Sequence, residues 1–270
     1  MIARILIIAG SDSGGGAGIQ ADIKAVTMMG GHAMTAIAAL TAQNTLGVEG
    51  VLPVPADFVL KQIDMVVSDI GVGAVKIGMI GAPDTAVAVA KRLGGLSGIP
   101  IVFDPVMVAS SGAALADETT IAAFRKLLGV ATLVTPNAPE LGVLTGRAVT
   151  THEEAEEAAR LLAREWRAAV LTKGGHIDGP FLQDALVGAD GVTVMRWQSP
   201  RIDTRSTHGT GCTLASAVAT GLGQGRSLAE AVGRARDYVQ RAIAAAPGLG
   251  TGHGPLGHTL GRVPYDEMSG

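Results

Sequence analysis

Thr207-His208-Gly209-Thr210-Gly211-Cys212-Thr213, followed by the apolar run Leu214-Ala215-Ser216-Ala217-Val218-Ala219, is the most informative stretch of this 270-residue chain. It predicts a tight glycine turn that opens a helix. Glycine adopts backbone conformations that other residues avoid, and it lets a ligand come close. Because the first N–H groups of a helix have no partner within it and lie at the positive end of the helix dipole, this turn is expected to bind an anion such as a phosphate.

The only cysteine of the chain, Cys212, lies in the same turn. A helix N-terminus lowers a thiol pKa, so this position predicts a cysteine that acts as a base or a nucleophile. A lone cysteine is also often a buried small apolar side chain that fills a turn. The cysteine alone leaves both interpretations open.

The composition favours a single α/β domain over residues 1–270. Hydrophobic residues make up 47% of the chain and charged residues 17%, so the chain can bury a large core. Aromatic residues account for only 3%. The core must therefore consist of Ala, Val, Leu and Ile, which is typical of helices packed on buried strands.

Composition also excludes several classes of protein. One cysteine rules out an internal disulfide framework and a cysteine-based zinc cluster, and it indicates a reducing compartment. A net charge of −3 without a basic cluster argues against a nucleic-acid partner. The apolar run at residues 5–9 is too short for a signal sequence, and no later run reaches the roughly 18 residues that span a bilayer. We therefore expect a soluble, cytoplasmic protein.

Near the start of the chain, an apolar run at residues 4–9 is followed by a glycine-rich loop at residues 10–18 and a helical pattern at residues 19–26. This order indicates strand, loop and helix. It is not a dinucleotide fingerprint, because Ile19 occupies the place of the third glycine of G-x-G-x-x-G. It is not a P-loop either, since the chain contains no Gly-Lys pair. The loop either approaches its ligand by another pattern or only turns.

Strands and helices alternate between this loop and the turn at residues 207–213. The patterns predict further strands at residues 33–42, 74–78, 101–104, 132–135 and 168–172, and helices at residues 56–70, 84–93, 117–128, 212–223 and 227–244. Strands at residues 182–187 and 192–197 have no helix between them, which indicates an antiparallel edge. The whole is one doubly wound, mostly parallel sheet, and the glycine-rich tail from Pro247 is expected to be a surface loop.

Polar residues follow several of these strands. In open α/β sheets, ligands bind outside the carboxyl ends of the strands. Gln43 either binds a ligand or stabilises a turn. Asn137 and Glu140 form either a helix capping box or a metal or nucleotide site, and Lys173 is either a phosphate contact or a surface lysine. If these groups converge with Asp104 and the glycine turn, they form a phosphoryl-transfer site.

The motifs resemble those of the ribokinase-like superfamily, and more closely those of the hydroxymethylpyrimidine/phosphomethylpyrimidine kinases. The resemblance covers nearly the whole chain and rests on six segments in this order: residues 9–22, 76–79, 104–107, 135–140, 173–176 and 207–213. It implies a three-layer α/β/α fold and the use of ATP with Mg²⁺. It also implies two successive phosphorylations of 4-amino-5-hydroxymethyl-2-methylpyrimidine in thiamine biosynthesis, by a homodimer.

By position, the resemblance implies a role for each candidate residue. Cys212 stands where sugar kinases have a catalytic aspartate, and the backbone of Gly209, Thr210, Gly211 and Cys212 would form an anion hole. Lys173 would reach the ATP phosphates. Asp104, Asn137 and Glu140 would organise Mg²⁺ and its waters. The pyrimidine pocket would be lined by Gly10, Asp22, Gln43, Met79 and Val106.

The replacement of an aspartate by Cys212 suggests a hypothesis about the second phosphorylation. Its acceptor is already a phosphate monoester, which a fixed carboxylate would repel, whereas a thiol can be neutral. In the first step a thiolate would accept the hydroxymethyl proton.

Three other functions compete with this one. A pyridoxal kinase is the nearest alternative, and Gln43 argues against it because an amide matches the ring nitrogen and exocyclic amine of an aminopyrimidine. A non-catalytic sensor of the pyrimidine is the second. A sugar kinase is the third, and Cys212 in place of aspartate disfavours it.

Overall fold

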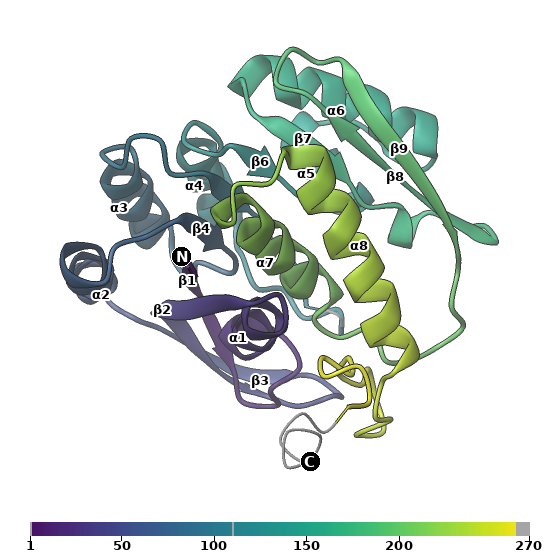
Figure 1. Cartoon of the computed structure of the whole chain (residues 1–270), viewed down its shortest axis with the longest axis horizontal. Coiled ribbons are helices and arrows are strands. Elements are labelled where there is room, and N and C mark those ends of the chain that lie inside the picture. The colour runs from purple at the N-terminus through teal and green to yellow at the C-terminus, as the bar shows by residue number, and fades with distance from the viewer. Residues whose placement is uncertain (1, 110, 263–270) are drawn as a thin grey trace.

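The computed structural model describes residues 2–109 and 111–262, and in these residues a nine-stranded sheet runs through the molecule (Figure 1). The strand order is β3-β2-β1-β4-β5-β6-β7-β8-β9. The strands are β1 (Ala3–Asp12), β2 (Gly31–Gln43), β3 (Val48–Pro53), β4 (Ala74–Ile77), β5 (Ile101–Phe103), β6 (Leu133–Val134), β7 (Ala169–Thr172), β8 (Phe181–Val187) and β9 (Thr193–Pro200). The six neighbouring strands β2, β1, β4, β5, β6 and β7 pair in parallel. At the two edges, β3 pairs antiparallel with β2, β8 with β7, and β9 with β8. The expected mostly parallel sheet with an antiparallel edge is confirmed.

Helices cover both faces of the sheet and complete three α/β/α layers. The helices are α1 (Gly18–Met28), α2 (Ala56–Asp69), α3 (Pro83–Leu93), α4 (Glu118–Leu128), α5 (Ala138–Thr145), α6 (His152–Trp166), α7 (Thr210–Gly223) and α8 (Leu228–Ala244). One apolar core joins the sheet to α2 through α6, and the other joins it to α1, α7 and α8. Figure 1 shows α1, α7 and α8 together on one side of the sheet.

The central strand β1 explains this layering. Its residues Leu6 and Ile8 pack into the core under α2 through α6, whereas Ile5 and Ile7 pack into the core under α1, α7 and α8. A strand that is buried on both faces is a continuous apolar run rather than an alternating one. The parallel partners of β1 are β2 on one side and β4 on the other. Their carboxyl ends open together at one edge of the sheet, which is where ligands bind in such folds.

Two parts of the chain differ from the sequence-based expectation. Strand β3 pairs antiparallel with β2 and was not expected, because Gly50 and Pro53 interrupt a segment that is mostly exposed. The tail after Pro247 is not only a surface loop. Leu256 and His258 are buried, and the His258 Nε2 lies 2.9 Å from the Thr213 hydroxyl of α7. Residues 263–270 of the tail lie outside the described residues.

Candidate functional site

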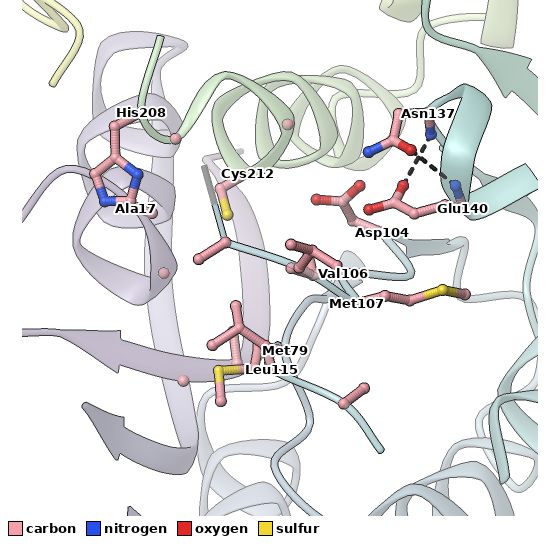
Figure 2. A pocket seen from close by; sticks show the side chains of 18 of the residues that line it. Ala17, Met79, Asp104, Val106, Met107, Leu115, Asn137, Glu140, His208 and Cys212 are labelled. Carbon is pink, nitrogen blue, oxygen red and sulfur yellow. Dashed lines mark hydrogen bonds between the residues drawn. The ribbon is translucent and has the colours of Figure 1, made fainter. Parts of the chain in front are cut away.

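The carboxyl ends of β1, β2, β4, β5 and β7 and the N-terminus of α7 enclose a cavity of about 620 Å³. Its wall brings together most of the residues selected from the sequence. Figure 2 shows Cys212 at the start of α7 facing Val106, with Asp104 and Glu140 farther along the same wall. The predicted residues that line it are Gly10, Gln43, Met79, Asp104, Val106, Asn137, Glu140, Lys173, Gly209, Thr210, Gly211 and Cys212.

The glycine turn has the predicted form. Gly209 is the N-cap of α7 with φ 86°, a left-handed conformation that favours glycine. A Cβ at Gly209 would also overlap the carbonyl oxygen of Gly16 in the N-terminal loop. A Cβ at Gly211 would lie 3.3 Å from both Asp104 Oδ2 and Lys173 Nζ. The turn therefore needs glycine at position 209, and at Gly211 its open side faces a lysine and a carboxylate.

Lys173 links the two candidate metal-organising carboxylates. Its Nζ lies 2.9 Å from Asp104 Oδ1 and 3.8 Å from Glu140 Oε2. The Thr135 hydroxyl donates a further hydrogen bond to Asp104 at 2.9 Å. Burial raises the pKa of Asp104, but Lys173 and Lys76 outweigh it and hold that pKa below its usual value. A charged lysine and an ionised aspartate therefore lie side by side at the anion-binding turn.

Asn137 and Glu140 form the capping box of α5. The Glu140 N–H donates to Asn137 Oδ1 at 2.9 Å, and the Asn137 N–H donates to Glu140 Oε2 at 2.8 Å (dashed in Figure 2). Both residues also line the cavity, so the structural and the functional interpretation coexist. Burial raises the pKa of Glu140 to about 7, and the Asp104 charge adds to the rise while Lys173 opposes it. Glu140 thus changes charge near neutral pH.

The carboxylates of Asp104 and Glu140 suit Mg²⁺ only when phosphate oxygens supply further ligands. Among residues 2–109 and 111–262, no group of three or more His, Cys, Asp or Glu side chains could hold a metal ion. Mg²⁺ keeps several waters and is usually held by one or two carboxylates together with substrate phosphates. The carboxylates of Asp104 and Glu140 beside an anion-binding turn fit that mode.

The structure overturns the expected pKa of Cys212. Burial raises the pKa of this thiol to about 11, and the negative charges of Asp22 and Asp104 add to the rise. Lys76 and the Gly18 N–H lower it, but they do not compensate for the burial. The thiol is therefore neutral at pH 7 in the free protein, and the prediction of a thiolate at the helix N-terminus is wrong.

Asp22, which we expected to line the pyrimidine pocket, is fully buried behind the cavity wall. Its carboxylate accepts hydrogen bonds from the Lys76 ammonium at 2.9 Å and the Ser216 hydroxyl at 2.7 Å. Lys76 is itself fully buried and forms part of the wall. Burial lowers the pKa of Lys76, but Asp22 and Asp104 more than offset this effect and keep the lysine charged.

The glycine-rich loop at residues 10–18 does not present its amides to a ligand. The Asp12 carboxylate accepts the N–H groups of Gly14, Gly16 and Ala17 at 2.8 to 3.0 Å. His208, in the turn before α7, places its Nε2 2.8 Å from the same carboxylate. The loop is therefore a tight turn organised around Asp12 and held against the start of α7.

The wall also contains residues without a role in the sequence-based prediction, among them Asp12, Thr41, Lys76 and His208. A usable signal existed for Lys76, because a charged residue inside an otherwise apolar strand needs a buried partner. His208 stood within the most informative stretch, but its partners lie far away in the sequence. Only the folded chain reveals them.

A doubly wound sheet whose strand ends carry a lysine and two carboxylates beside a glycine turn at a helix N-terminus is the arrangement of the ribokinase-like fold. Known proteins support this class. The model of the phosphomethylpyrimidine kinase family matches residues 12–257. The chain belongs to this family.

Two curated relatives are similar over almost the whole chain. The thiamine biosynthesis bifunctional protein ThiED of Geobacter sulfurreducens is 49% identical over 257 residues, which are 95% of this chain and 52% of that protein. The chain thus spans about half of the ThiED length. The hydroxymethylpyrimidine/phosphomethylpyrimidine kinase of Rhizobium meliloti is 47% identical over 96% of this chain and 97% of its own.

Solved structures of two activities share the fold. The ADP complex of Bacillus subtilis pyridoxal kinase has a TM-score of 0.88 at 31% identity and covers 97% of this chain and 100% of its own. The phosphomethylpyrimidine kinase of Clostridium difficile has a TM-score of 0.78 at 36% identity, and the match covers 89% of this chain and 99% of that structure's chain. In the part of the chain that the structure describes, no helix is long and apolar enough to cross a membrane.

Proposed function

We propose that the chain is an ATP-dependent kinase that phosphorylates 4-amino-5-hydroxymethyl-2-methylpyrimidine and then its monophosphate. The observation that carries this proposal is one cavity whose wall contains the anion-binding turn, Lys173 and the Gln43 amide. A phosphoryl group and an aminopyrimidine need these two kinds of contact. Relatives that carry the corresponding names support the proposal over nearly the whole chain.

In this proposal the chain acts by positioning and by charge. The N–H groups at the start of α7 and the Lys173 ammonium stabilise the negative charge of the transferred phosphoryl group. Phosphoryl transfer passes through a loose transition state, so the protein has little covalent chemistry to perform. Gln43 pairs with the aminopyrimidine edge, while Gly10, Met79 and Val106 supply the surrounding wall. Cys212 adds no fixed negative charge.

Asp104 and Glu140, with Asn137 holding Glu140 in place, would organise Mg²⁺ and its waters around the ATP phosphates. When bound, the ion would neutralise phosphate charge. Lys173 Nζ lies 2.9 Å from Asp104 Oδ1 and 3.8 Å from Glu140 Oε2, so in this proposal it exchanges one carboxylate for a phosphate oxygen when ATP binds.

Pyridoxal kinase is a second candidate, and the fold of the Bacillus subtilis pyridoxal kinase favours it. Pyridoxal lacks the aminopyrimidine edge that an amide recognises, so Gln43 separates the two candidates. A sensor without turnover would keep the fold but form no product.

One experiment tests all three candidates. The protein is incubated with MgATP and an equimolar mixture of hydroxymethylpyrimidine and pyridoxal, and the products are identified by mass spectrometry. We expect the pyrimidine monophosphate and then the diphosphate. Pyridoxal phosphate alone would contradict the role of Gln43, and the absence of any product would favour the sensor.

We also propose that two copies of the chain associate and that the protein is cytoplasmic. Exposed apolar side chains on β2 and β3, which include Leu40, Val51 and Leu52, support the first proposal. The single free cysteine supports the second, since disulfides are rare in the reducing cytosol.

A further inference from the structure

We infer that His208, held by Asp12, fixes the orientation of the Gln43 amide and so determines which hydrogen-bonding edge of a pyrimidine the cavity accepts. The inference rests on the proposed function. It makes His208 a positioning residue and Thr41 its counterpart on the other side of the amide. Figure 2 shows His208 beside Ala17, at the end of the cavity where α7 begins.

The first step concerns the proton on His208 Nε2. The Asp12 carboxylate already accepts three backbone N–H groups, and it lies 2.8 Å from His208 Nε2. Burial raises the pKa of Asp12, but the hydrogen bonds from His208, Ala17 and Gly14 lower it below its usual value. An ionised carboxylate only accepts hydrogen bonds. The Nε2 atom of His208 therefore carries a hydrogen and donates it.

The second step concerns the Thr41 hydroxyl, which has a single hydrogen to donate. Its Oγ1 lies 3.0 Å from the Ser11 carbonyl oxygen and 3.1 Å from the Gln43 amide. A carbonyl oxygen only accepts, so the hydrogen of Thr41 belongs to Ser11. The lone pairs of Thr41 are then left for the amide. The amide group that faces Thr41 must be the NH₂.

These two steps settle the orientation of the amide. The other end of the Gln43 amide lies 3.3 Å from His208 Nε2, which is a donor. The single hydrogen of Nε2 points to Asp12 at 2.8 Å. An amide NH₂ would meet a nitrogen that has no lone pair to offer, so the carbonyl oxygen faces His208. In the structure Gln43 Oε1 lies on the Thr41 side and Nε2 on the His208 side. The oxygen and nitrogen of an amide occupy nearly identical positions, so the hydrogen-bond network decides between them, and here it requires their exchange. This orientation keeps the Gln43 NH₂ away from the His208 N–H and places it at the Thr41 lone pairs.

A fixed amide accepts only one arrangement of donor and acceptor in a ligand. The free N–H of Gln43 lies on the Thr41 side, and the free lone pair lies on the His208 side. A 4-aminopyrimidine offers a ring-nitrogen acceptor beside an amine donor, which complements this pair. The corresponding 4-pyrimidinone offers a ring N–H beside a carbonyl. Its ring N–H would face the N–H of Gln43, and its carbonyl oxygen would face the Gln43 oxygen, so neither hydrogen bond forms. A rotated amide would accept the pyrimidinone.

The test compares two acceptors, hydroxymethylpyrimidine and its analogue with a 4-oxo group in place of the 4-amino group. The readout is the ratio of their kcat/KM values for phosphorylation with MgATP. For the wild type we expect a ratio of roughly 100 or more, because a site built on hydrogen bonds rejects the mismatched partner. His208→Leu and Thr41→Val should each lower the ratio about tenfold or more, mostly through the KM of the amino compound.

Controls separate positioning from general damage to the turn. His208→Gln keeps an N–H donor and should retain most of the ratio. Thr35→Val lies on the same strand outside the cavity and should not change it. Equal losses on both acceptors, with the ratio unchanged in His208→Leu and Thr41→Val, would overturn the inference while the proposed function stands. A wild type that phosphorylates neither acceptor would overturn the proposed function and the inference with it.

Discussion

At the scale of single residues, burial decides the chemistry of Cys212. A helix N-terminus stabilises a thiolate, but the removal of water disfavours any charge, and here the second effect is larger. The carboxylates of Asp22 and Asp104 act in the same direction. A neutral thiol does not repel an acceptor that already carries a negatively charged phosphate. The neutral form is therefore compatible with the proposed second phosphorylation.

Cys212→Asp should slow the second phosphorylation more than the first. The new carboxylate would repel the monophosphate acceptor, and one added charge at short range costs enough to reduce the rate at least about tenfold. Separate kcat/KM values for the two acceptors measure this difference. Cys212→Ser is the control, because it stays neutral and should affect both steps alike. An equal loss in both steps with Cys212→Asp would contradict this account.

Lys76→Met should destabilise the fold by about 3 to 5 kcal/mol, because it leaves the Asp22 carboxylate buried without its cation. The double variant Lys76→Met with Asp22→Asn should recover much of this loss, since asparagine can still accept the Ser216 hydrogen bond. Urea unfolding monitored by circular dichroism gives the free energies. A double variant no more stable than Lys76→Met would show that the pair is not the main contribution.

Sequence patterns located the candidate residues better than they defined their surroundings. Gln43, Asp104 and Lys173 follow apolar runs, so their place at the strand ends was predictable. The burial of Asp22 was not, because its partner Lys76 is 54 residues away in the sequence. The pKa of Cys212 was missed for the same reason, since it depends on groups from several strands.

At the scale of elements, the C-terminal tail secures α7. His258 contacts Thr213 on this helix, and the Tyr238 hydroxyl of α8 donates to the His258 carbonyl oxygen at 2.9 Å. Burial lowers the pKa of His258 to about 4, with a smaller contribution from Lys24. The helix that carries the glycine turn is thus attached to the tail by a neutral histidine.

This histidine predicts a loss of stability in mild acid. Between pH 6.5 and about pH 4 the unfolded chain binds a proton at His258 and the folded chain does not, so the free energy of unfolding falls as the pH falls. The contribution amounts to up to about 3 kcal/mol. His258→Gln, which cannot be protonated, should flatten this dependence in urea unfolding at pH 4 to 7. An unchanged slope would exclude His258 as its source.

Long elements were predictable and short exposed ones were not. The helices and buried strands follow from apolar runs and helical spacing, as in β1 and α8. Strand β3 contains Gly50 and Pro53 and buries little, so no local pattern indicates it. Its pairing with β2 depends on backbone hydrogen bonds to a neighbouring strand and not on a pattern in its own residues.

At the scale of the whole molecule, the two edges of the sheet lead to a test of the proposed dimer. Leu52 on the β3 edge is 65% exposed, and Val194 on the β9 edge is 54% exposed. Leu52→Glu should convert the dimer to monomers, because a charge in an apolar interface is costly to bury. Val194→Glu should leave the dimer intact. Sedimentation velocity gives the oligomeric state of each variant. If only Val194→Glu dissociated the dimer, the interface would lie on the β9 edge, and the proposed β3 interface would be wrong.

The hydrogen bond between Asp12 and His208 joins residues that are 196 positions apart in the chain. Contacts of such long sequence separation form late, because closing a long loop costs entropy before it yields any contact. During synthesis, β1 can pair with β2 and β4 long before α7 leaves the ribosome. The cavity is then only half built. A nascent chain can therefore acquire most of its sheet before its cavity is complete, and the proposed activity requires that α7 has been translated and has packed onto β1.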